Sequence, residues 1–380
     1  MITQDEIKVI YGEDALQMTK SLLSACDLAS LIPGKDAKIG LKPNLVVAKP
    51  AESGATTHPE ILAGTIEYLQ EHGFHNLMIL EGSWVGDSTE RAFHVSGYDK
   101  LSARYHVPLF DTKKDSYVKK TYGGIMMEIS RTSLSLDFLI NMPVMKGHCQ
   151  TIVTGAMKNL KGTLSDAEKR HFHALGLDRP IAYLNMIEHC GFLLGDGICG
   201  DLDFEEGGNP VRMNRIFAGL DPVLFDSYIA SSMGYAPEDI GYIRIGSEIG
   251  VGSKDIAHAR ITELNHDSTK AKPSASGKVR ALARYAVQKE ACSACWANLI
   301  QALARLQDSG ELGALADRPA CDGQGFRNVV PDESEAGRLA SRCPGIGHCT
   351  AGFRTHVEGC PPGASEILNY LRAEICTGKE

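Results

Sequence analysis

The sequence predicts an α/β fold of Rossmann-like stacked βαβ units, followed by a smaller C-terminal domain rich in cysteine. Short apolar runs alternate with helical patterns over the first two thirds of the chain, as is typical of βαβ units. A polar stretch, 266–277, has the composition of a linker. Most of the eleven cysteines lie after Glu290. We therefore expect an α/β domain at 1–265 with a ligand site, the linker, and a metal-binding module at 278–380.

The expected strands and helices follow from local patterns. Apolar, β-branched runs predict strands at 7–10, 37–41, 77–80, 138–141 and 192–194. The segment 59–71 places its apolar residues at helical spacing, and Gly73 ends it. Thr57 as N-cap, with Glu60 three residues later, forms a capping-box pattern. Asp221 is expected to cap a helix that Pro222 opens, and Pro237 to open another.

Composition excludes several classes of protein. The 380 residues are 43% hydrophobic and 23% charged, which indicates a globular chain and excludes fibrous and disordered ones. Lys and Arg number 39 against 47 Asp and Glu, a net charge of −8, so we expect no nucleic-acid partner. No apolar run approaches the ~20 residues of a membrane helix, and the start shows no secretion signal. We therefore expect a cytoplasmic protein with its cysteines reduced and no membrane partner.

Four cysteines are the candidate ligands of a metal group. Cys292 and Cys295 stand at a helix start, where the helix dipole favours thiolates. Cys349 and Cys360 each follow a histidine or glycine in a glycine-rich segment, and Pro361 follows the second. Four thiolates can bind a 4Fe-4S cluster or a zinc ion, and one CxxC with two separated cysteines favours the cluster over zinc.

Other cysteines have simpler expected roles. Cys343, and less so Cys321, are spare ligands that could replace one of the four. Cys26 in a helix and Cys376 near the terminus are best explained as free thiols.

Several short blocks of the sequence resemble the family called domain of unknown function 362. The resemblance covers nearly the whole chain. Its blocks are 41–45, 55–60, 146–148, 155–162, 196–197, 219–223, 292–299, 345–349 and 359–364. Membership implies an iron-sulfur segment, which many members carry, but no particular activity. This chain lacks the doubled CxxCxxCxxxCP pattern, which favours a single cluster.

Polar residues that follow the predicted strands are the candidate ligand site, because α/β folds bind ligands at the carboxyl ends of strands. Helix N-termini and lysines there would suit a small anionic molecule, carboxylate-bearing or phosphorylated. Each residue also has a structural explanation, such as a lysine that offsets a helix dipole or a histidine in the core. The substrate-binding candidates are Lys42, Asn44, Thr57, His58, Lys158 and Asn159; the catalytic candidates are Lys146 and His148, with His171 and His173 in a polar loop as weaker ones.

Together these patterns predict an iron-sulfur oxidoreductase or electron-transfer protein that exchanges electrons with an unidentified donor or acceptor protein. In this hypothesis Lys42 and Lys146 neutralise the anionic ligand and His148 handles a proton. The alternative is a non-catalytic binding or carrier protein in which a cluster or zinc ion stabilises the C-terminal domain. A third hypothesis is Lewis-acid chemistry at an open cluster iron. The sequence leaves open whether the protein is an enzyme, and it is compatible with a homodimer.

Overall fold

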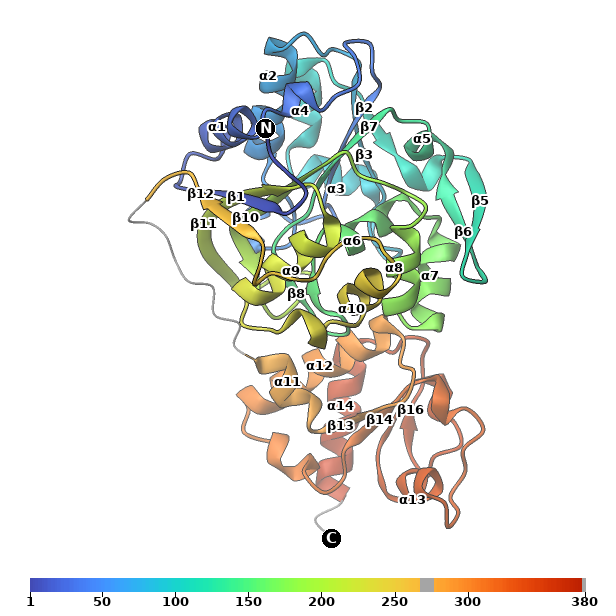
Figure 1. Ribbon diagram of the computed structural model, residues 1–380. Helices are drawn as coiled ribbons and strands as arrows, with labels where there is room; N and C mark the ends of the chain where they lie inside the picture. Colours follow the sequence, from blue (N-terminus) through green and yellow to red (C-terminus); the bar gives the residue numbers. More distant parts are fainter. Residues whose placement is uncertain (267–276, 378–380) are drawn as a thin grey trace. The chain divides into compact units, whose positions relative to one another are not determined.

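A computed structural model describes residues 1–266 and 277–377 (Figure 1). The described residues form two compact units. The first comprises residues 1–170 and 178–266, and the second comprises His171–Leu177 and residues 277–377. Of the expected linker, only His266 and Gly277 lie within the described residues.

The first unit is built on a sheet of eight strands in which parallel pairing dominates. Strand β11 is antiparallel to both of its neighbours, β1 and β10, and all other neighbours are parallel. The α/β class predicted from the sequence is confirmed. In spatial order the strands are β12 (Arg260–Glu263), β1 (Glu6–Tyr11), β11 (Pro210–Gly219), β10 (Phe192–Asp201), β7 (Phe138–Met142), β2 (Ile39–Pro43), β3 (Leu77–Glu81) and β4 (Leu109–Asp111).

Helices and two hairpins complete the first unit. The hairpins pair β5 (Tyr117–Tyr122) with β6 (Ile125–Ser130) and β8 (Lys146–His148) with β9 (Ile152–Thr154). The helices are α1 (Ala15–Cys26), α2 (Pro59–Glu71), α3 (Thr89–Val95), α4 (Tyr98–Tyr105), α5 (Arg131–Leu134), α6 (Ala156–Asn159), α8 (Asp178–Leu184), α9 (Pro222–Ser232) and α10 (Gly241–Glu248), with α7 (Asp166–Leu175) at the division between the units.

The core explains why α1 and α2 form beside the sheet. Leu22 of α1 and Ile66 of α2 are fully buried in one apolar cluster with Ile39, Leu41 and other strand residues. Such burial contributes roughly 1.5–3 kcal/mol per large apolar side chain. Gly64 lets the two helices approach closely, since a Cβ there would lie 2.7 Å from the carbonyl oxygen of Leu16.

Four expectations about local structure are wrong. The N-cap of α2 is His58 rather than Thr57, because the Thr57 hydroxyl bonds to the main chain of Asn44 and Met142 instead. Strand β10 does not end at Leu194 but continues to Asp201, since β11 pairs with it along that length. His171 and His173 lie on helix α7 and not in a loop. Pro237 begins a single 3₁₀ turn, Pro237–Asp239, before α10. The cap of α9 is Asp221, as predicted.

The second unit contains a parallel sheet of four short strands. Their order is β13 (Ala286–Gln288), β14 (Ala320–Asp322), β15 (Gly345–Ile346) and β16 (His356–Val357). The helices are α11 (Lys278–Ala283), α12 (Ser293–Asp308), α13 (Glu335–Arg342) and α14 (Ala364–Thr377), and α12 packs against α14. Across both units, none of the described helices combines the length and the apolar composition that a membrane crossing requires.

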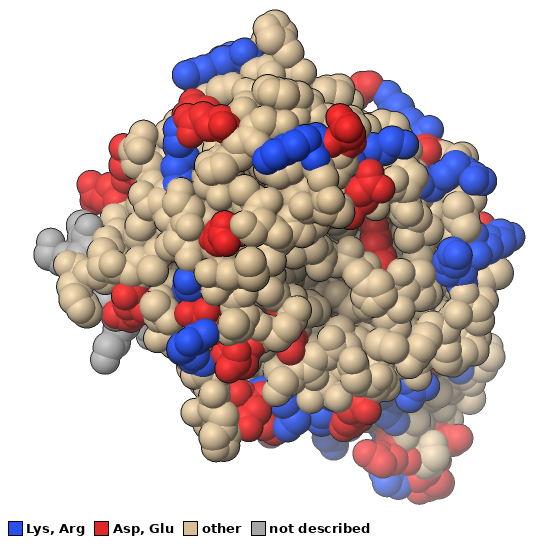
Figure 2. All heavy atoms as spheres, turned by 45° about the horizontal axis from the view of Figure 1, so that its top comes forward, with Lys and Arg blue, Asp and Glu red and all other residues tan. Residues whose placement is uncertain are grey.

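Acidic and basic side chains are interspersed over the face shown in Figure 2. That face therefore presents no large field of a single sign.

Candidate functional site

Buried polar side chains gather where β2, β3 and β7 end. The three strands run in parallel, so their carboxyl ends lie at one edge of the sheet. Lys42 and Asn44 belong to the end of β2 and the turn after it, Glu81 ends β3, and Asn141 lies near the end of β7. The short helix α6 adds Asn159 to this group.

Three asparagines form a chain of side-chain hydrogen bonds within the group. The Asn44 Nδ2 donates to Asn159 Oδ1 at 2.9 Å, and the Asn159 Nδ2 donates to Asn141 Oδ1 at 2.7 Å. The Asn141 Nδ2 donates in turn to the carbonyl oxygen of Ala156 at 2.8 Å. Because each amide is both donor and acceptor, the chain fixes the orientation of all three.

Lys42 pairs with Glu81 inside the protein. Its Nζ lies 3.1 Å from both carboxylate oxygens, and both side chains are almost completely buried. Glu81 also accepts hydrogen bonds from the backbone N–H groups of Leu45 and Gly82. A Cβ at Gly162 would lie 1.9 Å from Glu81 Oε1, so only glycine allows this close approach. The charge of Lys42 is thus balanced within the chain.

Lys146 lies on the opposite side of Asn44. Its Nζ donates to Asn44 Oδ1 at 3.0 Å and to the carbonyl oxygens of Ala55 and Glu205 at 2.6 and 3.0 Å. Complete burial, together with the neighbouring Lys158, lowers its pKa to about 8 against the opposing effect of Glu205.

Glu205 connects two of the candidate residues. It accepts from the Lys158 ammonium and from His148 Nε2, the latter at 3.0 Å. Burial acts to raise the pKa of Glu205, but the charge of Lys158 and then the interaction with His148, which includes a hydrogen bond, hold it well below its usual range. Burial and the charge of Lys158 also lower the pKa of Lys161 well below its ordinary value. Buried lysines therefore surround the Glu205 carboxylate.

His148 is held as a neutral imidazole. Its Nδ1 accepts from the backbone N–H groups of Gln150 and Thr151 at 3.1 and 3.0 Å. The proton must therefore be on Nε2, which donates to Glu205. Burial, and then Lys158, lower its pKa to about 4. With both ring nitrogens engaged, His148 is poorly suited to the proton transfer that the sequence suggested for it.

His58 has a different arrangement. Its Nδ1 and its backbone N–H both lie 2.8 Å from Asp196 Oδ2, while Asp196 Oδ1 accepts from Ile198 N. Burial acts to lower the pKa of His58, but the Asp196 carboxylate outweighs it, and the pKa is raised above 6.5. Of the two histidines, His58 is the one whose protonated form is stabilised by its surroundings. The sequence could not show this, because Asp196 is 138 residues away.

The four candidate cysteines lie in the second unit, close enough for electrostatic interactions between them. Cys292 is the N-cap of α12 and Cys295 lies in its first turn. Burial raises the pKa of Cys292, and the charges of Cys349 and Cys360 raise it further. Burial also raises the pKa of Cys295, and Asp322 and the other three thiols add to this effect. Negative charge on Cys349 or Cys360 thus disfavours negative charge on Cys292 and Cys295.

The surroundings of the four thiols suit a positively charged metal group. Asp322, at the end of β14, has a buried Oδ2 with no hydrogen-bond partner among the described residues, and burial raises its pKa to about 7. Gly347 approaches the thiols, since a Cβ there would lie 3.8 Å from Cys295 Sγ. As the side chains stand, the described part of the chain contains no group of three His, Cys, Asp or Glu that could hold a single ion.

Cys321 and Cys343, the spare ligands, form a separate pair. Each thiol is hydrogen-bonded to the other, and both belong to an apolar cluster with Phe326 and Phe353. Cys376 is exposed on α14, and Cys26 is fully buried in α1.

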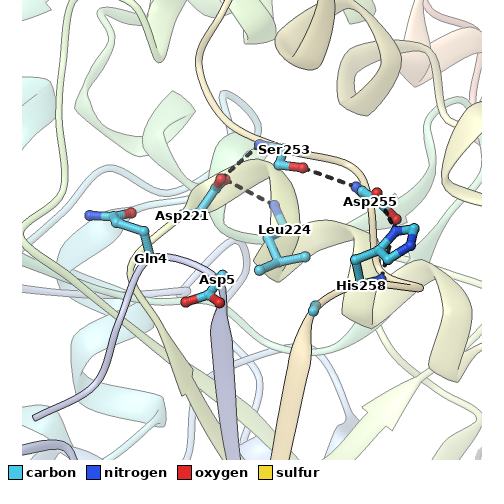
Figure 3. A pocket seen from close by; sticks show the side chains of 8 residues that line it. Gln4, Asp5, Asp221, Leu224, Ser253, Asp255 and His258 are labelled. Carbon is cyan, nitrogen blue, oxygen red and sulfur yellow. Dashed lines mark hydrogen bonds and ion pairs between the residues drawn. The ribbon is translucent and has the colours of Figure 1, made fainter.

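Two hollows lie near polar residues. One, with a volume of about 560 Å³, is lined by Arg327, Asn328, Val330, His348, Cys349, Ala351, Gly352 and Cys360. The other, of about 220 Å³, lies beside Asp221 (Figure 3). There the Asp221 carboxylate accepts from the backbone N–H groups of Val223, Leu224 and Ser253, and Asp255 pairs with His258. Those polar atoms serve the local fold, so the first hollow, beside two thiols, is of more functional interest.

Comparison with known proteins gives a family match and similarities to individual proteins. The model of the family described as Domain of unknown function (DUF362) matches residues 39–231. A thylakoid-associated protein from Synechocystis sp. is 26% identical over 136 residues, which cover 36% of this chain and 42% of that protein. The lactate racemase apoprotein from Thermoanaerobacterium thermosaccharolyticum is 14% identical, with a TM-score of 0.37 over 66% of this chain and 58% of that one. The matched regions thus span less than two thirds of either relative.

Proposed function

The chain belongs to the DUF362 family, as the sequence predicts, and we propose that it is an iron-sulfur protein that transfers electrons to or from a small anionic ligand. In this proposal Cys292, Cys295, Cys349 and Cys360 bind one 4Fe-4S cluster. The buried lysines at the edge of the eight-stranded sheet bind the ligand. When bound, the cluster supplies single electrons at a potential set by burial and by hydrogen bonds to its sulfurs.

The mutual influence of the four thiols is the observation that carries this proposal. Cys349 and Cys360, from two distant loops, raise the pKa of Cys292 and Cys295 at the helix start, although the cysteines are up to 68 positions apart. Four clustered thiolates are stabilised by a cationic metal group. The N-terminus of the 16-residue helix α12 adds a favourable dipole, and the Arg327 guanidinium bonds to Cys349.

The buried lysines around Glu205 support the anionic ligand. Lys42 is balanced by Glu81, whereas Lys146 and Lys158 both interact with Glu205. Burial, with the charge of Lys158 added to it, lowers the pKa of Lys146 and of Lys161, so the charged form of each lysine is costly there. A bound carboxylate or phosphate group would offset that cost through charge-assisted hydrogen bonds.

The first experiment measures iron, zinc and acid-labile sulfide in protein purified without oxygen, with absorption spectra before and after dithionite. The proposal expects about four irons and four sulfides per chain and a broad visible band that dithionite bleaches. One zinc ion without a visible band would refute it and support a binding protein stabilised by a structural metal.

Variants then test the ligand set. Replacing Cys349 or Cys360 separately by Ser should remove most of the iron and sulfide, whereas Cys376→Ser, which alters an exposed cysteine on α14, should leave both unchanged. Loss of iron in the Cys376→Ser control equal to that in Cys349→Ser would contradict the assignment. If Cys360→Ser keeps a full cluster, a residue other than Cys360 is the fourth ligand.

Ligand binding is tested separately with inorganic phosphate and acetate as probes. We expect each anion that binds to raise the melting temperature of the protein by mass action. Lys158→Met should abolish the increase, and Lys20→Met, which removes a lysine paired with Glu71 on the surface, should not. Equal increases in both variants would show that the anions bind elsewhere.

A further inference from the structure

Cys321 and Cys343 lie together in the second unit, away from solvent. Cys321 is in the middle of β14, and Cys343 precedes β15, the neighbouring parallel strand. The Cys321 N–H donates to the carbonyl oxygen of Pro344 at 2.8 Å, which places the two cysteines beside each other. They are 0% and 1% exposed and are packed with Phe326 and Phe353. Both are free thiols, and their side chains are hydrogen-bonded to each other.

The two sulfurs are chemically different. The hydrogen bond from Cys321, with smaller contributions from Arg342 and Arg318, lowers the pKa of Cys343 to about 6 against the effect of burial. The same hydrogen bond and burial raise the pKa of Cys321. Arg318 is held in place, because its Nε donates to the carbonyl oxygen of Arg342 at 2.9 Å and its Nη2 pairs with Glu374 at 3.1 Å. Of the two sulfurs, Cys343 therefore favours the thiolate form, and the Cys321 thiol, which also donates to the carbonyl oxygen of Pro319 at 3.7 Å, favours the protonated form.

We propose that Cys321 and Cys343 form a second redox centre, a two-electron dithiol that a small peroxide oxidises to a disulfide. The pair is independent of the four-cysteine site and of the proposed function. Both sulfurs are buried, which excludes a bulky oxidant from the closed structure and favours one as small as hydrogen peroxide.

The reaction balances with hydrogen peroxide alone. The Cys343 thiolate attacks one peroxide oxygen, the O–O bond breaks, and the hydroxide that leaves takes up a proton to become water. Cys343 is then a sulfenic acid. The sulfur of Cys321 attacks the sulfur of Cys343, an S–S bond forms, and the hydroxyl group leaves with the Cys321 proton as a second water. Two thiols and one peroxide thus give one disulfide and two waters.

The fully buried Cys26 provides a matched control in the same chain. It is 0% exposed, like Cys321, but burial raises its pKa to about 12, and no cysteine is among the groups that shift it. Burial alone therefore cannot account for a difference in oxidation between Cys26 and the pair.

The test treats reduced protein with hydrogen peroxide, removes the oxidant with catalase, and alkylates under denaturing conditions before peptide mass spectrometry. We expect a linked peptide containing Cys321 and Cys343, formed at least about tenfold faster than Cys26 is lost. In Cys321→Ser, dimedone should trap a sulfenic acid at Cys343. In Cys343→Ser, Cys321 should stay as reactive toward the alkylating agent as in untreated protein.

Two results would overturn the proposal. One is equal alkylation of Cys321, Cys343 and Cys26 after oxidation of the wild-type protein. The other is a Cys343 linked mainly to one of the four candidate ligand cysteines. The wild-type measurement decides the question even if a serine variant fails to fold, and Cys26→Ser serves as a variant in which the linked peptide should form unchanged.

Discussion

Lys42→Met removes one partner of a buried ion pair and should strongly destabilise the first unit. The Lys42 Nζ lies 3.1 Å from both oxygens of Glu81, and neither side chain is more than 4% exposed. Breaking a buried pair from one side typically costs about 3–5 kcal/mol, because the other charge stays buried. Glu81 keeps hydrogen bonds from Leu45 N at 3.1 Å and Gly82 N at 2.7 Å. We therefore expect the lower end of that range, about 3 kcal/mol.

The assay must separate the two units, and the two tryptophans allow this. Trp84 lies in the first unit and Trp296 in the second. In a Trp296→Phe background, fluorescence during urea unfolding reports the first unit through Trp84. The double variant Lys42→Met/Glu81→Gln should recover about 2 kcal/mol relative to the sum of the single variants, which measures the coupling directly.

A surface pair provides the control. Lys20→Met removes a lysine that pairs with Glu67 and Glu71 on the outer face of α1 and α2, and such pairs contribute about 0–1 kcal/mol. If Lys42→Met costs no more than Lys20→Met, or if the coupling with Glu81 is near zero, the two charges are not held together in a dry interior and the argument for a buried polar site loses its basis.

Two further predictions concern protonation. His148 should titrate with a pKa of about 4 and carry its proton on Nε2, whereas the pKa of His58 should be raised above 6.5. ¹⁵N-detected NMR of the imidazoles, assigned with His148→Gln and His58→Gln, checks both. A His148 that titrates near 6.5 would contradict the hydrogen bonds assigned to it. Burial raises the pKa of Asp226 from 3.8 to about 7, so the folded state binds the extra proton, and this residue's contribution to stability should fall as pH rises from about 4 to 7. Unfolding free energies of Asp226→Asn should lack that part of the pH dependence, and an unchanged pH profile would refute the assignment.

Much of the first unit could be predicted from local sequence because its elements have strong local signals. The strands at 39–43 and 77–81 are apolar runs, and the helix 59–71 has clear periodicity. The position of Lys42 and Asn44 also follows from a general rule, since parallel strands end at one edge. Asn159 joins them from helix α6. The partners of these residues could not be predicted in this way. Glu205 reaches Lys158 from 47 positions away, and no periodicity marks it.

The second unit shows the limit of local signals more sharply. Its four strands have only two or three residues each, too few for an alternating pattern to stand out. Their pairing is set by the tertiary fold. The separation of Cys321 and Cys343 from the four candidate ligands depends on that pairing, because β14 and β15 place them side by side. Spacing along the chain indicates Cys343 as an alternative ligand, whereas the structure places it beside Cys321.

The two units share one electrostatic feature that links their proposed roles. In the first, burial and the charge of Lys158 lower the pKa of Lys146 and Lys161. In the second, Asp322 and the other three thiols add to the effect of burial and raise the pKa of Cys295, with Arg327 as a nearby cation. Buried charges of one sign are costly unless a group of the other sign joins them. A bound anion would relieve the first imbalance and a metal group the second. Each should therefore stabilise the unit that binds it, so phosphate should raise the unfolding midpoint reported by Trp84 and iron with sulfide the one reported by Trp296.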